Sequence, residues 1–297
     1  MTHSLTELKG EIDAVLSTLL PEQSAIAQAI VNAMRHSVLG GGKRLRPMLA
    51  YAAAQACGGN PRTALQAGCA VELIHAYSLI HDDLPAMDDD HLRHGLPSAH
   101  IAYGEANAIL AGDSLHSLAF RTIATDETLD NATRIVMIRL LSDAAGWAGM
   151  AGGQCLDIDA EGHILDLDEL HALHAAKTGA LIRVAVQFGA HAAEGTAPDA
   201  SRYTALTHYG NHVGLAFQVM DDVLDVTQTT AKLGKPARSD EVLNKNTFPK
   251  LMGLDAAIEY AQVLIEKAKS DLMKMDLAPE KTYLLEKLAD LVIERDH

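Results

Sequence analysis

Several kinds of residue are scarce in this sequence. Of 297 residues, three are cysteine and only 4% are aromatic. Cys57, Cys69 and Cys155 have no zinc-ligand spacing and are too few for a disulfide framework, which favours a reducing compartment. Basic residues are also few, with 24 Lys and Arg against 39 Asp and Glu. The formal net charge of −15 argues against partners such as nucleic acids or anionic membranes.

Long apolar runs are missing as well. No run reaches the roughly 18 uninterrupted apolar residues that suggest a membrane-spanning helix, and the first ten residues contain no apolar signal core. We therefore expect a cytoplasmic protein without a membrane span. The sequence also has no apparent internal repeat, low-complexity segment or interdomain linker. These absences favour a single domain over residues 1–297.

The residues that are abundant favour helices. Hydrophobic residues make up 48% of the chain, and alanine and leucine dominate over the aromatic and β-branched types that sheets prefer. Apolar positions recur at helical spacing in residues 4–35, where Pro21 separates two expected helices, the second of which includes Ala25 and Ile26. Further helices are expected over about 202–227 and in residues 254–294, and Gly152-Gly153 suggests a close approach between helices. The sequence predicts an all-α domain whose helices surround a deep central cavity.

Two dense acidic clusters form the candidate site. Residues 82–90 read Asp-Asp-Leu-Pro-Ala-Met-Asp-Asp-Asp and follow an apolar run. The second cluster is 221–225, Asp-Asp-Val-Leu-Asp, whose outer carboxylates share one helical face. A lone acidic run is usually solvated surface, but two that each follow an apolar helical run favour a bound cation. Oxygen-only ligands suit Mg²⁺ or Ca²⁺ rather than zinc.

The geometry of the first cluster depends on Pro85. Asp82 and Asp88 are six residues apart, so on a regular helix their side chains would point about 120° apart. Proline interrupts a helix, and a loop at Pro85 would bring Asp88 back beside Asp82.

A basic turn is the third motif. Three glycines, 40–42, precede cations at 43, 44 and 46. This segment is either an anion-binding site or an ordinary basic turn, and it lacks the spacing of a phosphate-binding Walker loop.

Together these motifs resemble the short-chain trans-polyprenyl diphosphate synthase family, in particular its bacterial farnesyl-forming members. The resemblance extends from about Leu39 to Leu254. It implies a prenyltransferase that joins isopentenyl diphosphate to allylic diphosphates such as dimethylallyl and geranyl diphosphate. Farnesyl diphosphate is the expected product, with geranylgeranyl or mixed C10–C20 products as the alternative. It also implies about three Mg²⁺ ions, with Mn²⁺ as a substitute, and a homodimer.

The resemblance also assigns residues. Six carboxylates are the expected metal ligands: Asp82, Asp83, Asp88, Asp221, Asp222 and Asp225. The expected contacts to isopentenyl diphosphate are Lys43, Arg46 and His75, with His94 in place of a second arginine. The allylic diphosphate is expected to contact Arg93, Lys177 and Thr178, while Gln218 shares the face of the second cluster. The residues expected to carry catalysis are Asp82, Asp83, Asp88, Arg93, Lys177, Asp221, Asp222 and Lys235.

Two further elements complete these expectations. Residues 232–250 are polar and basic and resemble the family's closing loop, with Lys235 and Lys245 as substrate contacts; Arg238 and Asn244 depart from the usual pattern. Tyr77 lies about 7–8 Å along the helix from Asp82, at 1.5 Å per residue. We expect Tyr77 and its neighbour Ser78 to limit the length of the product.

Competing interpretations remain open at this stage. His75, taken alone, is more often a core histidine. Asp157 and Asp159 are candidates for metal binding, but we expect them to be structural or solvated. A terpene cyclase also uses an acidic motif with Mg²⁺, but it has no need for the basic turn. A His-Asp phosphohydrolase would use the doublet at 81–82, without evident partners. An inactive regulatory subunit of a prenyl synthase is the non-enzymatic alternative.

Overall fold

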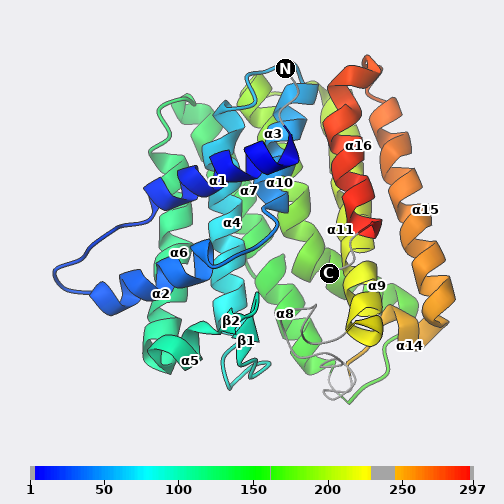
Figure 1. Ribbon diagram of the computed structural model, residues 1–297. Coiled ribbons are helices and arrows are strands. Elements are labelled where there is room, and N and C mark those ends of the chain that lie inside the picture. Colours follow the sequence, from blue (N-terminus) through cyan, green and yellow to red (C-terminus); the bar gives the residue numbers. More distant parts are fainter. Residues whose placement is uncertain (1–3, 161, 229–244, 295–297) are drawn as a thin grey trace.

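The computed structural model describes residues 4–160, 162–228 and 245–294. As expected, the fold is all-α, with helices α1 (Leu5–Leu19), α2 (Gln28–Leu39), α3 (Leu45–Ala56), α4 (Thr63–Asp82), α5 (Ala99–Tyr103), α6 (Glu105–Ala124), α7 (Asn131–Ala145), α8 (Met150–Asp159), α9 (Leu167–His174), α10 (Ala180–Glu194), α11 (Ala200–Thr227), α14 (Phe248–Met252), α15 (Leu254–Met273) and α16 (Pro279–Ile293). A π-helical turn, Ala175–Gly179, joins α9 to α10, and β1 (Leu92–Arg93) pairs antiparallel with β2 (Leu96–Pro97). Figure 1 shows the long helices α4, α6, α11, α15 and α16 running roughly side by side.

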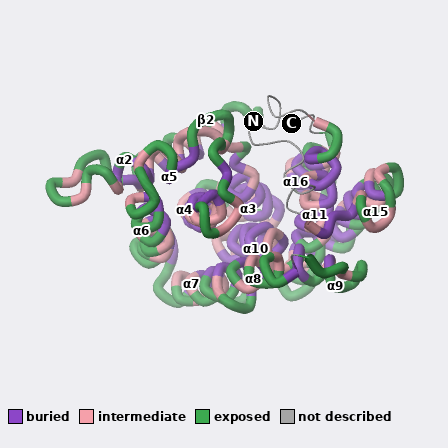
Figure 2. The backbone as a smooth tube through the Cα atoms, turned by 90° about the horizontal axis from the view of Figure 1, so that it is seen from below, coloured by how far each residue is buried: buried purple, intermediate pink, exposed green. Residues whose placement is uncertain are grey.

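The helices α3, α4 and α10 form the centre of the molecule. Most of their side chains are buried, and Figure 2 shows buried backbone concentrated on α3 and α10 with exposed positions on the outer helices. A helix that is apolar on all sides is buried on all sides. Small residues let these helices approach closely: a Cβ added at Gly189 of α10 would lie 2.4 Å from the Ala50 carbonyl oxygen of α3.

One contiguous cluster of buried side chains draws on helices from α1 to α16. We therefore propose that residues 1–297 form one domain. Among the helices that the structure describes, none has the length and apolar character needed to cross a bilayer.

Most expected helices are confirmed, and one start was wrong. The second helix was expected to include Ala25 and Ile26, but α2 begins at Gln28 and Ile26 is 97% exposed. Side chains supply the reason. Ser24 Oγ accepts a hydrogen bond from the Ala27 N–H at 3.0 Å, and Gln28 Oε1 accepts one from the Ser24 N–H at 2.8 Å. These two bonds hold residues 24–27 in a turn that precedes the helix, whose N-cap is Ala27.

Candidate active site

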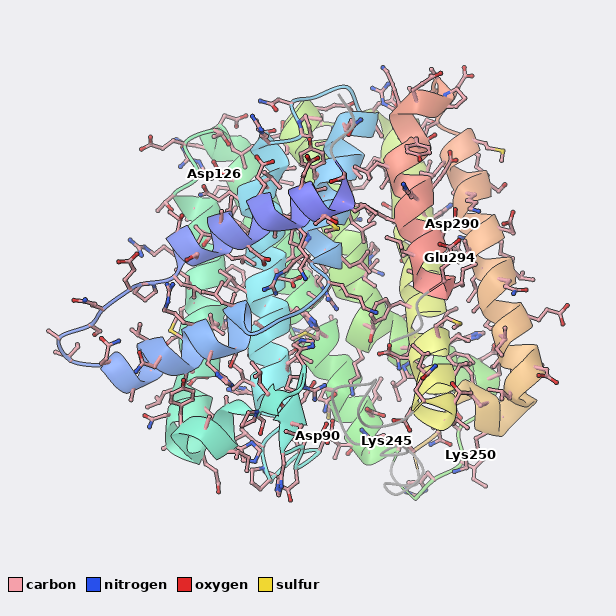
Figure 3. All side chains as sticks on the ribbon, in the orientation of Figure 1. Asp90, Asp126, Lys245, Lys250, Asp290 and Glu294 are labelled. Carbon is pink, nitrogen blue, oxygen red and sulfur yellow. The ribbon has the colours of Figure 1, made fainter. Side chains whose placement is uncertain are left out.

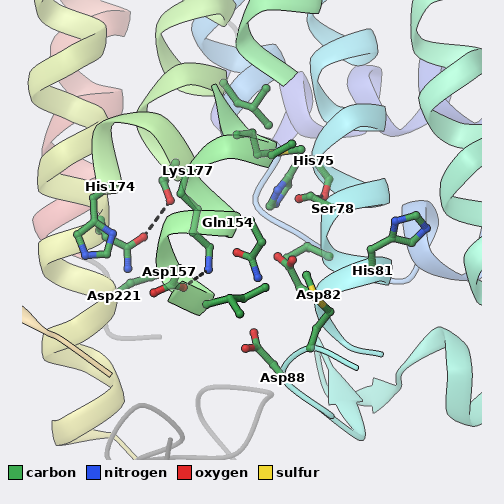
Figure 4. Close-up of a pocket in the computed structure, with 18 of the residues that line it drawn as sticks. His75, Ser78, His81, Asp82, Asp88, Gln154, Asp157, His174, Lys177 and Asp221 are labelled. Atoms are coloured by element: carbon green, nitrogen blue, oxygen red, sulfur yellow. Dashed lines mark hydrogen bonds and ion pairs between the residues drawn. The ribbon is translucent and has the colours of Figure 1, made fainter. Parts of the chain in front are cut away.

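A cavity of about 470 Å³ opens where α4, α8, the π-helical turn and α11 converge, and residues 245–247 complete its wall. Figure 4 shows Asp82 and Asp88 on one side of this space, Asp157 and Asp221 on the other, and the Lys177 side chain entering between them. Both acidic clusters therefore contribute carboxylates to one cavity. Side chains far apart in sequence meet here because α4 and α11 both pack against α10.

The first acidic cluster folds as the proline suggested. α4 ends at Asp82, and the Asp88 N–H donates to the Asp82 carbonyl oxygen at 2.9 Å, so the chain turns back on itself. Both side chains line the cavity. Burial, reinforced by Asp88, raises the pKa of Asp82 to about 6 despite the attraction of Lys177. A cation bound nearby would stabilise the ionised form of such a buried carboxylate.

Asp83 lies on a different face from Asp82. It does not line the cavity; it is buried and pairs with Arg93, whose guanidinium also bonds Asp90 at 3.1 Å. Burial raises the pKa of Asp83 to about 6 even though Arg93 lowers it. The Arg93 side chain still reaches the cavity wall. The assignment of Asp83 as a metal ligand stays a prediction.

The second acidic cluster is divided between the cavity and the packing around it. Asp221 and Asp222 line the cavity, whereas Asp225 is buried outside it. Asp222 Oδ1 accepts from the Gln218 side-chain amide at 2.9 Å, and Asp222 Oδ2 accepts from the Phe248 N–H at 3.0 Å. Thr178 Oγ1 in turn donates to Gln218 Oε1 at 2.9 Å. Asp222 thus links α11 to both the π-helical turn and the start of α14.

Two lysines pair with carboxylates inside the cavity. Lys177 Nζ lies 2.5 Å from Asp157 Oδ2, and Lys245 Nζ lies 2.8 Å from Asp88 Oδ1 and 3.9 Å from Asp157 Oδ2. Burial alone would raise the pKa of Asp157, but Lys177 and Lys245 outweigh it and the pKa is lowered. Figure 3 shows Lys245 and Asp90 at the same end of the molecule.

The π-helical turn explains how Lys177 reaches this position. A local kink is expected at Lys177-Thr178-Gly179, and here the chain widens to π geometry, which is frequent at functional sites. Gly153 of α8 lies against this turn, because an added Cβ would be 2.2 Å from the Lys177 backbone nitrogen. The close approach brings Asp157, one turn further along α8, beside the lysine.

The basic turn contributes one side chain to the cavity. Arg46 lines the cavity, and burial lowers its pKa although nearby Glu72 raises it. Arg44 instead has a structural role: it adopts φ 58° and pairs with Asp13 at 2.7 Å and Glu72 at 3.3 Å. Lys43 is exposed and does not line the cavity.

The two predicted histidine contacts occupy different environments. His75 lines the cavity, and burial together with Arg46 holds its pKa well below the ordinary value, so the ring is neutral. His94 lies outside this cavity and borders a smaller one beside Asp83 and Arg93. Burial and Arg93 lower the pKa of His94 to about 4, so it also is neutral near pH 7.

The residues expected to limit product length, Tyr77 and Ser78, precede Asp82 on α4 by five and four positions. Tyr77 and Ser78 both line the cavity. The Tyr77 ring contacts the rings of His81 and His116 edge-on, with centroids 5.4 and 5.3 Å apart. Ser78 Oγ donates to the His75 carbonyl oxygen at 2.9 Å. Lys235, Arg238 and Asn244 lie outside the described residues.

Sequence reasoning missed several residues of the cavity wall. Asp157 was expected to be structural or solvated, but it lines the cavity between two lysines. Gln154 and His174 also line it, and their buried polar atoms Oε1, Nδ1 and Nε2 have no hydrogen-bond partner among the described residues. The available signal was Gly153, whose close helix contact places α8 at the site.

A helical fold that brings two carboxylate clusters and buried cations to one cavity defines a class of enzymes that act on phosphorylated substrates with a divalent cation. The comparison with known families places this chain more narrowly. It belongs to the polyprenyl synthetase family, whose model matches residues 27–282.

Individual relatives agree with this membership. The chain is 49% identical to farnesyl diphosphate synthase of Escherichia coli strain K12, over 90% of this chain and 89% of that protein. It is 44% identical to a chloroplastic geranylgeranyl pyrophosphate synthase of Capsicum annuum, over 90% and 72% respectively. A solved geranyltransferase of Helicobacter pylori, complexed with magnesium and isoprenyl diphosphate, superposes with a TM-score of 0.88 at 32% identity, covering 99% of this chain and 100% of that one.

Proposed function

We propose that the protein is a prenyltransferase that joins isopentenyl diphosphate to dimethylallyl or geranyl diphosphate, with farnesyl diphosphate as the product. The observation that carries this proposal is the convergence of Asp82, Asp88 and Asp221 with Arg46 and Lys177 on one cavity. Activation of a diphosphate ester needs two kinds of group: carboxylates that hold a divalent metal ion, and basic side chains that bind phosphate oxygens. The farnesyl diphosphate synthase relatives support the same activity.

The cavity fits Mg²⁺. Its carboxylates offer oxygen ligands, which Mg²⁺ prefers, and the raised pKa of Asp82 marks a carboxylate whose negative charge lacks sufficient compensation. Asp82, Asp88 and Asp221 would hold the ion. When bound, Mg²⁺ offsets the charge that accumulates on a departing diphosphate. A count of about three ions, and substitution by Mn²⁺, rest on the family resemblance alone.

The side chains of the cavity supply the remaining requirements. Lys177, Arg93 and Thr178 line the cavity. In this proposal the two cations donate charge-assisted hydrogen bonds to the allylic diphosphate, and Thr178 donates its hydroxyl. Arg46 and neutral His75 also line the cavity, and we propose that they hold isopentenyl diphosphate. Lys43 and His94 would have to reach the second substrate from outside the cavity wall, so their roles stay predictions.

The reaction balances without a side-chain base. The allylic C–O bond breaks and its electron pair leaves with the diphosphate. The double bond of isopentenyl diphosphate then attacks the allylic carbon, forming the new C–C bond and leaving a cation that loses a proton. We propose that the released diphosphate accepts that proton, so that no side-chain base is required. The chain therefore contributes charge stabilisation and positioning rather than proton transfer.

Geranylgeranyl diphosphate is the second candidate product, because the chain also resembles a geranylgeranyl pyrophosphate synthase at 44% identity. Tyr77 favours the shorter product. Its ring lines the cavity and lies on α4 five residues before Asp82, where it would block a longer chain. We also propose a homodimer, on the family resemblance, and a cytoplasmic location, on the cysteine content and the lack of an apolar signal core.

The experiment is a product analysis by mass. Purified protein with Mg²⁺, isopentenyl diphosphate and a C5 or C10 starter should release C15 diphosphate. Asp82→Asn and Asp221→Asn should each lower turnover by roughly 10²–10³-fold, whereas Asp143→Asn, an exposed carboxylate on α7, is the matched control. Isopentenyl diphosphate left unconsumed would point to a cyclase, free phosphate without C–C bond formation to a phosphohydrolase, and no turnover to an inactive subunit.

A further inference from the structure

Outside the cavity, one group of side chains has the composition of a transition-metal site. Asp89, His91 and His100 each offer one ligand atom, and these atoms lie within 4.8 Å of one another. Asp89 Oδ1 is 3.9 Å from His91 Nε2 and 3.9 Å from His100 Nε2. None of the three lines the cavity of the acidic clusters. They form a separate group, which we call the hairpin cluster.

The local backbone brings the hairpin cluster together. Asp89, near the end of the first acidic cluster, adopts a left-handed conformation with φ 50°. The β1–β2 hairpin follows, and the Ser98 N–H donates to the His91 carbonyl oxygen at 3.0 Å, which closes it. His100 lies in the first turn of α5, directly after the hairpin. Twelve consecutive residues, 89–100, therefore supply all three side chains.

His100 supplies an independent indication of a ligand. It is only 7% exposed, and its Nε2 faces Asp89 with no hydrogen-bond partner among the described residues. Its other ring nitrogen, Nδ1, lies 3.1 Å from Ser98 Oγ. When Nδ1 donates its proton to that hydroxyl, the Nε2 lone pair is directed at Asp89. Metal-binding histidines almost always donate their second ring N–H in this way, which fixes the tautomer.

We propose that Asp89, His91 and His100 bind a divalent transition metal such as Zn²⁺. Two imidazoles and a carboxylate are a ligand set that Zn²⁺ and similar ions accept, with water in the fourth position. Zn–ligand bonds of about 2.0–2.2 Å place neighbouring ligand atoms roughly 3.3 Å apart. The exposed side chains of Asp89 and His91, 59% and 69% exposed, are free to close that remaining distance onto buried His100.

A metal in the hairpin cluster would act on the first acidic motif. Asp89 follows Asp88, whose carboxylate lines the cavity, and the hairpin carries Arg93, which also reaches it. The ion would tether this segment to α5 and neutralise the charge of Asp89. It would not bind the carboxylates of Asp82, Asp88 and Asp221, which would remain available to the cavity. The proposal is independent of the proposed activity, because it concerns a site that touches no substrate.

Cobalt binding tests the proposal, because four-coordinate Co²⁺ with imidazole ligands absorbs visible light far more strongly than six-coordinate Co²⁺ in oxygen sites. Co²⁺ is titrated into the full chain with excess Mg²⁺, which occupies oxygen-only sites but competes poorly for imidazole. One equivalent should bind with the strong spectrum, and Zn²⁺ should displace it. His91→Ala should weaken binding by at least about 100-fold, and Ser98→Ala by about 10-fold as the loss of a supporting hydrogen bond.

His208→Ala, which removes an exposed histidine of α11, is the matched control and should leave the titration unchanged. Removal of buried His100 can also disturb α5, so exposed His91 provides the decisive variant. Strong-spectrum binding that persists unchanged in His91→Ala would mean that the ion sits elsewhere. A weak spectrum only, or no binding in the presence of Mg²⁺, would equally overturn the proposal.

Discussion

Gly153 offers the sharpest test of how the cavity is assembled. An alanine Cβ there would lie 2.2 Å from the Lys177 backbone nitrogen and 2.5 Å from its Cα. Ordinary contact begins near 3.4 Å, so α8 and the π-helical turn must separate by about 1.2 Å. Backbone atoms cannot rotate away as a side chain can. Overpacking of this kind costs about 1–3 kcal/mol.

The same displacement should impair turnover in a protein that remains folded. Lys177 pairs with Asp157 at 2.5 Å, and α8 carries Asp157, so separation of the two elements pulls this pair apart. A misplacement of about 1 Å in a catalytic group can cost roughly 10²-fold in rate. We therefore expect Gly153→Ala to lose about 1–3 kcal/mol of unfolding free energy and about 10²-fold in kcat.

Urea unfolding and steady-state kinetics on the same preparations measure the two effects. Gly10→Ala is the matched control, because a Cβ at this α1 position meets no atom within 4 Å. It should raise stability by about 0.5–1 kcal/mol through the helix propensity of alanine, with unchanged turnover. If Gly153→Ala behaves like Gly10→Ala, the close contact between α8 and the turn does not position Lys177.

Three further outcomes follow from the site. Tyr77→Ala removes the ring that borders the cavity and should shift products beyond C15; mass analysis that still shows only C15 would place the limit elsewhere. The folded state raises the pKa of Asp82 from 3.8 to about 6, so without Mg²⁺ its contribution to stability is fully present below about pH 4 and lost as pH rises through 6. Thermal unfolding should therefore show stronger Mg²⁺ stabilisation at pH 7 than at pH 5, and equal stabilisation would contradict this. Gln218→Leu leaves the Thr178 hydroxyl and Asp222 Oδ1 without their partner and should cost about 1–3 kcal/mol in urea unfolding, with an unchanged midpoint as the opposing result.

The helices could be predicted from the sequence because their apolar patterns are long. α11 was expected over about 202–227 and occupies Ala200–Thr227, and α4 ends at the first acidic cluster as expected. Short-range side-chain bonds decide the ends that the pattern missed. The α2 start depends on Ser24, whose N–H donates to Gln28 Oε1 and whose Oγ accepts from the Ala27 N–H. These bonds outweigh the apolar periodicity through Ala25 and Ile26.

The candidate site could be predicted only where charge is dense. The clusters at 82–90 and 221–225 are conspicuous because like charges repel unless a cation compensates them. Asp157 gives no such signal, since one carboxylate near Asp159 looks like ordinary surface. Its position beside Lys177 depends on the contact between Gly153 and a turn that lies 24 residues further along the chain. Contacts of this kind follow from tertiary packing, which periodicity does not encode.

The pairing of charges explains how so many carboxylates fold around one cavity. Lys245 contacts Asp88 of the first cluster and approaches Asp157, which Lys177 also contacts, so the protein's own cations lie between opposing carboxylates. A diphosphate that recruits these lysines withdraws their charge from Asp88 and Asp157. A divalent cation then restores the balance at the carboxylates, while the lysines compensate the phosphate. We therefore propose that each ligand lowers the electrostatic cost of binding the other, which would be positive coupling between two occupants of a single cavity.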